Sequence, residues 1–228
     1  GAANAVKTTA TNLAANTTTS GKIFITEANG ATVNTVSIDG VTVTGITSAG
    51  AVATDLIKLT STTGDITVSE VITAAGGAAD VALIATAGKI LQGSAAKQIT
   101  GHNVALTAGT GIGATGAATA GKARAADLSA NTTASGKIFI TEADGATVNA
   151  VTIDGVTVTG ITTAGAVATD LIKLTSTTGD ITVSEVITAA GGAADVALIA
   201  SAGKIVQGVA AKQITGNNVA LTAATGIG

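Results

Sequence analysis

The sequence predicts an all-β fold, a right-handed parallel β-helix (β-solenoid) built from stacked coils. Three observations indicate it: strands that alternate apolar and polar residues, a glycine corner that recurs about every 23 residues, and the absence of proline from all 228 residues. The alternation is clearest in LIKLTSTTGDITV, from Leu56 to Val68, where two strands of period two flank a Thr-Thr-Gly corner. We expect glycine at this corner because glycine adopts positive φ without steric cost. The right hand follows from the general preference of parallel crossover connections.

The corner glycines stand one or two residues before an isoleucine. They are Gly21, Gly64, Gly88, Gly111 and Gly136, separated by steps of 43, 24, 23 and 25 residues. If Gly45-Ile46 is a further corner inside the longest step, about five coils of roughly 23 residues fit between Gly21 and Gly136. A period of this length is typical of solenoid repeats.

The composition favours a narrow stack of strands and excludes several other classes of protein. Proline cannot donate to the hydrogen-bond ladders that join one coil to the next, so a solenoid leaves little room for it. The chain also has no Cys, Met, Trp or Tyr, and its two aromatic residues are Phe24 and Phe139. A formal net charge of −3 argues against nucleic-acid binding, and no apolar run is long enough for a membrane span.

The chain is also a tandem repeat with an offset of 115 residues. Of 113 aligned positions, 96 are identical between residues 1–113 and 116–228. We therefore expect two solenoid repeats, 1–115 and 116–228, that form one continuous rod and belong to a longer array. Within the first repeat we expect turns at Asn29-Gly30 and Asp39-Gly40, and a loop or wide corner over 74–79.

No catalytic, cofactor-binding or metal site is predicted. The acidic residues of the first repeat all recur 115 residues later but stand five to sixteen residues apart, without the spacing of a calcium loop: Glu27, Asp39, Asp55, Asp65, Glu70 and Asp80. Paired carboxylates of a polysaccharide-cleaving β-helix are an alternative, but an active site is rarely copied whole into the next repeat. His102 is replaced by Asn217, so it belongs to no repeated function.

Two kinds of residue suggest what the sides of the rod do. Phe24 lies between Ile23 and Ile25, so alternation places it, and likewise Phe139, on the outer face, where it makes a lateral contact between rods or lies under a loop. Lys58 and Lys173 also point outward, which would discourage lateral pairing of sheets. An ice-binding face is a weaker alternative, because the Thr-X-Thr pairs do not keep the 23-residue step.

The segments LIKLTSTTGDITV, VALIATAGKI and NVALTAGTGIG resemble the repeats of filamentous haemagglutinin-type proteins and other giant repetitive bacterial surface adhesins. This resemblance implies a right-handed β-solenoid in the shaft of a secreted or surface-anchored fibre, without catalytic residues or cofactors. Its partners would be neighbouring repeats, through head-to-tail or lateral self-association. Two alternatives remain open: a carbohydrate- or receptor-binding surface on the side of the rod, and a pair of Ig-like β-sandwiches.

Overall fold

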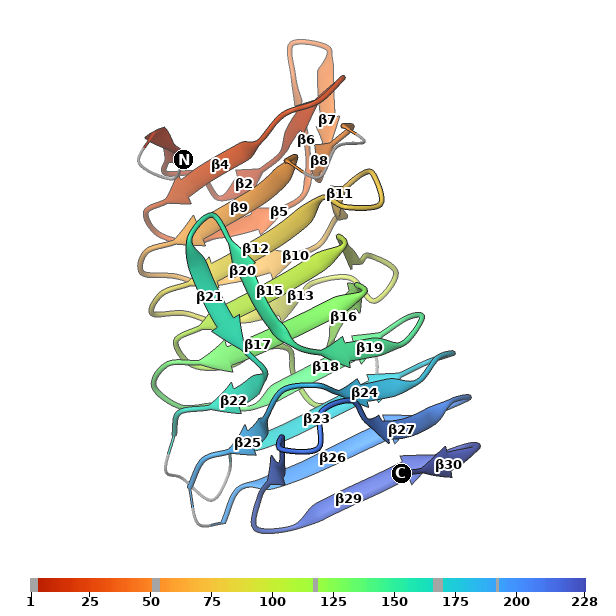
Figure 1. Ribbon diagram of the computed structural model, residues 1–228. Coiled ribbons are helices and arrows are strands. Elements are labelled where there is room, and N and C mark those ends of the chain that lie inside the picture. Colours follow the sequence, from red (N-terminus) through yellow and green to blue (C-terminus); the bar gives the residue numbers. More distant parts are fainter. Residues whose placement is uncertain (1–3, 51–53, 117–118, 166–169, 192) are drawn as a thin grey trace.

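The protein is all-β, and most of its strands are parallel and stacked in long sheets (Figure 1). This is a computed structural model, which describes residues 4–50, 54–116, 119–165, 170–191 and 193–228. No α-helix occurs in these residues. The arrangement is consistent with a β-solenoid, as the period-two alternation predicts.

Two long sheets and one short sheet carry the stack. Sheet A contains β1 (Val6–Thr8), β4 (Ile23–Glu27), β9 (Leu56–Ser61), β12 (Asp80–Ala85), β15 (Asn103–Ala108), β17 (Asp127–Thr132), β19 (Ala146–Val148), β22 (Ile161–Thr163), β24 (Ile181–Val183), β25 (Ile187–Ala189), β27 (Lys204–Gln207), β28 (Ile214–Thr215) and β30 (Gly226–Ile227). Sheet B contains β3 (Ala15–Thr17), β8 (Ile46–Ser48), β11 (Ile72–Ala74), β14 (Ile99–Thr100), β16 (Gly121–Arg124), β18 (Ile138–Glu142), β23 (Leu171–Ser176), β26 (Asp195–Ala200) and β29 (Val219–Ala223). Sheet C contains β2 (Asn12–Leu13), β5 (Ala31–Val33), β10 (Ile66–Val68) and β13 (Ile90–Gln92), and Ile112 bridges β13 of sheet C to β18 of sheet B.

The core consists of ladders of like side chains that repeat from strand to strand. Leu59, Leu83 and Leu106 are paired in register across β9, β12 and β15, and each is at most 1% exposed. Ile46, Ile72 and Ile99 form a similar ladder in sheet B. Because both ladders belong to one buried cluster, the apolar face of each strand is covered only when its neighbours are present.

The corner glycines fall into two groups: Gly21, Gly111 and Gly136 have positive φ, of 134°, 146° and 115°, whereas Gly64 and Gly88 are needed for a different reason from the one expected. Gly64 does not have positive φ. A Cβ on Gly64 would overlap the carbonyl oxygen of Asn29, and a Cβ on Gly88 would in turn overlap the carbonyl oxygen of Gly64. At these two corners one backbone lies directly on another, and only a residue without a side chain allows this approach.

The coil expected at Gly45-Ile46 is not formed. Instead, residues 35–44 make an antiparallel hairpin of β6 (Thr35–Ile38) and β7 (Val41–Thr44) between β5 and β8. Its turn is Asp39-Gly40, with φ of 50° and 79°, the positive values of a type I′ turn. The hairpin lengthens one step of the stack: Ile23 pairs with Ile57, 34 residues on, whereas Ile57 pairs with Val81, 24 residues on.

The two repeats use the sheets in opposite ways. In the first repeat the longer strands β4, β9, β12 and β15 lie in sheet A, and their equivalents β18, β23, β26 and β29 lie in sheet B. The reason is the number of times that the chain crosses from one side of the stack to the other, counted over the described residues. We count one visit each time the chain runs through sheet A, and one each time it runs through sheets C and B on the opposite side of the stack. From β1 to β15 the chain makes five visits to sheet A and four to the opposite side, so the next repeat begins in sheet B, at β16. Because the number of visits is odd, a strand of one repeat and its equivalent in the next repeat lie on opposite sides of the stack, which we call the exchange of faces.

Candidate functional site

The second hairpin lies across the outer face of sheet A. It consists of β20 (Ala150–Ile153) and β21 (Val156–Thr159), and it contacts β12, β15 and β17. Figure 1 shows it in front of these strands, whereas the β6–β7 hairpin projects beyond the stack at its N-terminal end. Because the faces exchange between repeats, a hairpin of the second repeat covers strands of the first.

The sequence of this hairpin places one apolar side toward the sheet. Its turn is Asp154-Gly155, with φ of 49° and 75°, and Val151 is paired with Val158. Since directly paired residues share a side, Val151, Ile153 and Val158 all face sheet A, and they are 2%, 2% and 4% exposed. The opposite side is polar: the hydroxyl groups of Thr152 and Thr157 lie 2.8 Å apart.

The sheet offers small outward residues beneath the hairpin. Lys58, Ala82 and Ala105 follow one another in paired register across β9, β12 and β15. The two alanines, together with Leu56, form one buried cluster with the hairpin, and Phe24 packs against its edge. Small side chains at these positions let the hairpin approach the sheet closely. We call Leu56, Lys58, Ala82 and Ala105 docking surface 1.

An ion pair closes the tip of the hairpin onto this surface. Lys58 Nζ donates to Asp154 Oδ2 at 3.1 Å, and the two side chains are 8% and 17% exposed. The expected outward direction of Lys58 is therefore confirmed, but the hairpin covers the side chain. We call the buried cluster and this ion pair the clasp. A charge pair at this degree of burial is costly to break, because either partner alone would be left in an apolar setting.

The second repeat presents the same surface without a hairpin on it. The equivalents of docking surface 1 are Leu171, Lys173, Ala197 and Ala220, which we call docking surface 2. Lys173 and Ala220 are exposed, and Leu171 and Ala197 are half-buried. The tip of the β6–β7 hairpin is likewise uncovered, with Ile38 71% and Val41 67% exposed, whereas Val36 and Val43 nearer its base are half-buried. This chain therefore holds one completed clasp and the two separate halves of another.

The two phenylalanines lie near these surfaces but in different settings. Phe24 is half-buried beside Lys58, its partner in the β4–β9 pairing. Phe139 is 4% exposed and shares the lining of one hollow with Gly113 and Ala114, from the connection before β16. The lateral contact between rods through Phe24 and Phe139 stays a prediction.

Buried carboxylates cap the turns. Glu27 accepts hydrogen bonds from the Thr8 hydroxyl at 2.6 Å and the Ala10 N–H at 3.0 Å. Its equivalent, Glu142, accepts from the N–H groups of Ala125, Asp144 and Gly145, each at 2.7 Å. Both are fully buried. These carboxylates satisfy backbone donors that would otherwise be unpaired, which is a structural role.

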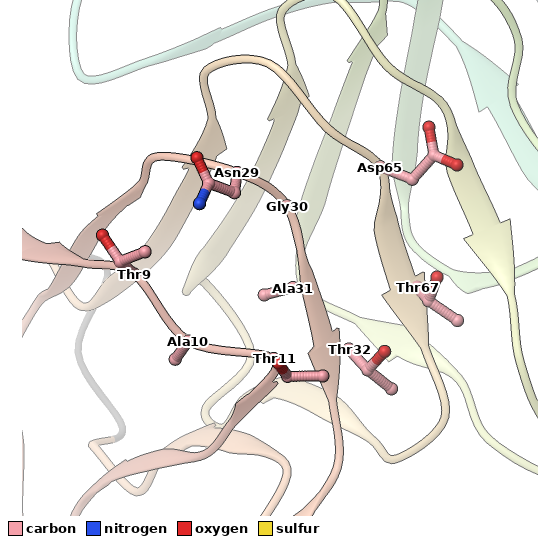
Figure 2. A pocket seen from close by; sticks show the side chains of 9 residues that line it. All are labelled: Thr9, Ala10, Thr11, Asn29, Gly30, Ala31, Thr32, Asp65 and Thr67. Carbon is pink, nitrogen blue, oxygen red and sulfur yellow. The ribbon is translucent and has the colours of Figure 1, made fainter.

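An open hollow at the N-terminal end is the polar candidate for a ligand (Figure 2). It has a volume of ≈ 350 Å³ and is lined by Thr9, Ala10, Thr11, Asn29, Gly30, Ala31, Thr32, Asp65 and Thr67. The Asp65 carboxylate points away from Thr9 and Asn29 and accepts from the Lys89 N–H at 2.7 Å. In the second repeat, Arg124 and Asp144 stand where Thr9 and Asn29 do and form an ion pair at 2.6 Å. The lining is thus not repeated.

Nothing in the described part of the chain gathers three His, Cys, Asp or Glu residues into a group that could hold a metal ion. Nor do the described residues include a helix long and apolar enough to cross a membrane. Comparison with known proteins matched no family model, no curated protein and no solved structure. The class of protein must therefore be argued from the stacked sheets and the clasp.

The sequence contained a signal for the clasp that the coil spacing concealed. Residues 35–44, TVSIDGVTVT, alternate on both sides of Asp-Gly, a strong signal for a two-residue hairpin. Because Gly45-Ile46 was interpreted as a corner, residues 35–44 were counted as part of a coil and not as a hairpin. Recognising the hairpin would have removed residues 35–44 from the coil count, but it would not have shown which strands the hairpin covers.

Proposed function

We propose that this chain is a structural segment of an extracellular fibre or adhesin stalk, a non-catalytic, stiff spacer. In this proposal the stack is a right-handed parallel β-solenoid with between four and five coils in each 115-residue repeat. Length is gained by adding repeats, and the chain acts at the cell surface or in a secreted fibre. Neighbouring repeats are its partners.

One observation carries the proposal: a continuous sheet joins the two repeats across their boundary. β15 and β17 lie on opposite sides of residue 115 and pair over six residues, from Asn103↔Asp127 to Ala108↔Thr132. The clasp then joins the second repeat to the outer face of the first. A boundary fixed by a sheet and by a buried cluster should transmit force and direction, which is what a spacer requires.

Spin labels on the two repeats test this stiffness. The chain has no cysteine, so Ala87→Cys and Ala202→Cys, at exposed and equivalent turns, create the only labelling sites. Electron-electron double resonance should give one narrow distance distribution. A broad distribution would show two independently moving units and would contradict a stiff spacer. Specific binding of the unlabelled chain to a glycan or receptor array would replace the spacer with a recognition function.

A further inference from the structure

We propose that this chain associates head to tail with a second copy of itself, through the β6–β7 hairpin of one copy and docking surface 2 of the other. The contact would reproduce the clasp that β20–β21 makes with docking surface 1. This goes beyond the proposed spacer function, because a spacer need not assemble from separate chains. The model for this contact is the clasp that the two repeats of one chain already form.

The hairpin half of the contact is preserved in sequence. The apolar side of β6–β7, formed by Val36, Ile38, Val41 and Val43, is identical to that of β20–β21. The two hairpins differ only where Thr35 and Ser37 are replaced by Ala150 and Thr152, both on the side away from the sheet. Yet Ile38 is 71% exposed and Ile153 is 2% exposed. The tip of an apolar side identical to that of β20–β21 is thus left uncovered.

The sheet half is equally preserved. Docking surface 2 has the same four residue types as docking surface 1, in strands with the same pairing: Lys173 pairs with Ala197, and Ala197 with Ala220. Beside Lys173 lies a hollow of ≈ 380 Å³ that Lys122 and Phe139 also line. By analogy with Asp154 on Lys58, Asp39 of a second copy would reach Lys173 at this hollow. Opposite charges would therefore meet at the tip of the hairpin.

The ends of the sheets fit the same arrangement. At the boundary inside the chain, β15 pairs with β17 and β14 with β16. At the C-terminal end of the stack lie β29, the equivalent of β15, and β28, the equivalent of β14. At the N-terminal end lie β2 and β3, which together are equivalent to β17, and β1, which is equivalent to β16. A second copy could continue the ladders strand for strand, since open strand edges pair readily. The interface would thus combine two sheet edges, a hairpin and one ion pair, and it would continue an interface that already exists within the chain.

A charge exchange between two variants tests the proposal. Asp39→Lys places two lysines at the contact, and Lys173→Asp places two aspartates there, and both positions are exposed in the single chain. Because Asp39 has φ of 50°, which lysine adopts less readily than aspartate or asparagine, Asp39→Asn serves as a second variant that removes the charge and keeps the turn. In an equimolar mixture the two charge-reversal variants should alternate, because every contact between unlike chains then joins a lysine to an aspartate. Ile38→Lys removes the apolar half independently, and circular dichroism verifies that each variant is folded.

Sedimentation equilibrium should show wild-type masses rising with concentration in steps of 21.4 kDa. Each charge variant alone should associate on the order of a hundredfold more weakly, and the equimolar mixture should recover the wild-type association. A wild-type chain that stays monomeric at high concentration would overturn the proposal. So would association that Ile38→Lys and both charge variants leave unchanged, since this would point to another surface, such as the lateral one around Phe24.

Discussion

Glu27 and Glu142 are equivalent buried carboxylates whose pKa values are shifted in opposite directions. Burial alone would raise the pKa of Glu27, but hydrogen bonds from the Thr8 hydroxyl and from the N–H groups of Asn29, Ala10 and Ala28 hold it below its ordinary value. Burial raises the pKa of Glu142, and its backbone donors do not offset this. The second repeat has Ala123 in place of Thr8, which removes a donor, and Asp144 in place of Asn29, whose charge further raises the pKa of Glu142.

The pH dependence of stability follows with opposite signs. The lowered pKa of Glu27 gives a contribution that is present above the unfolded-state pKa and is lost as pH falls through the folded-state pKa. The raised pKa of Glu142 gives a contribution that is present below the unfolded-state pKa and is lost as pH rises through the folded-state pKa. The two carboxylates therefore act against each other between acid and neutral pH.

We predict that Thr8→Ala raises the pKa of Glu27, because the variant loses the hydroxyl that donates to Glu27 Oε2 at 2.6 Å. A carboxyl-carbon NMR titration measures this directly. Thr11→Ala is the matched control: it removes a neighbouring, exposed threonine that the second repeat also lacks, and it should leave Glu27 unchanged. An unchanged Glu27 titration in Thr8→Ala would contradict the assignment.

At the residue scale the sequence predicted correctly which side chains point into the core, but not which groups surround each residue. Alternation correctly placed Ile57 and Leu59 inside and Lys58 outside. The reason for glycine at position 64 was wrong, because the close approach of the Asn29 backbone depends on how layers stack and not on local conformation. A single sequence reports the preferences of each residue, but not which backbone passes above it.

At the scale of the element, identical hairpins have different surroundings. β6–β7 and β20–β21 share their apolar side and their Asp-Gly turn, yet β20–β21 lies across β12, β15 and β17, whereas β6–β7 contacts β2 and β3 at the end of the stack and its tip is exposed. An isolated two-stranded hairpin is marginally stable in water, so tertiary contact should determine how much each one contributes. The chain thus provides its own control for the energy of the clasp.

We predict that Ile153→Ala lowers the free energy of unfolding by about 2–4 kcal/mol, because it removes a side chain that is 2% exposed and leaves a cavity in the clasp. Ile38→Ala, the equivalent change at a side chain that is 71% exposed, should cost less than about 0.5 kcal/mol. Urea unfolding of dilute protein measures both. Equal losses in the two variants would mean that the hairpins are equally packed and that no clasp exists.

The strands could be predicted from alternation and turn residues, but the place of the hairpin could not. Recognising TVSIDGVTVT as a hairpin needs only local signals. Knowing what it covers requires the number of sheet visits in 115 residues. That number decides whether a repeat meets its predecessor on the same face or on the opposite one, and no local pattern contains it.

At the scale of the whole molecule, the exchange of faces locks successive repeats together. With an even number of visits, each hairpin would lie on the same side as the last. With the nine visits found here, β20–β21 lies over the longer strands of the preceding repeat and pairs Asp154 with Lys58. Each added repeat of near-identical sequence would then lengthen the stack and also form a clasp with the repeat before it, which suits a stiff segment.

The relative reactivity of Lys58 and Lys173 tests this account most directly. Both lie in the sequence LIKLTS, so their chemical settings differ only through what covers them. In dilute protein treated briefly with an amine-reactive ester, mass spectrometry should show Lys173 modified at least about tenfold faster than the buried, ion-paired Lys58, since the ion pair and the hairpin must open first. The variant Asp154→Ala should narrow the difference. Equal reactivity of Lys58 and Lys173 in the unaltered chain would contradict the exchange of faces and the clasp that depends on it.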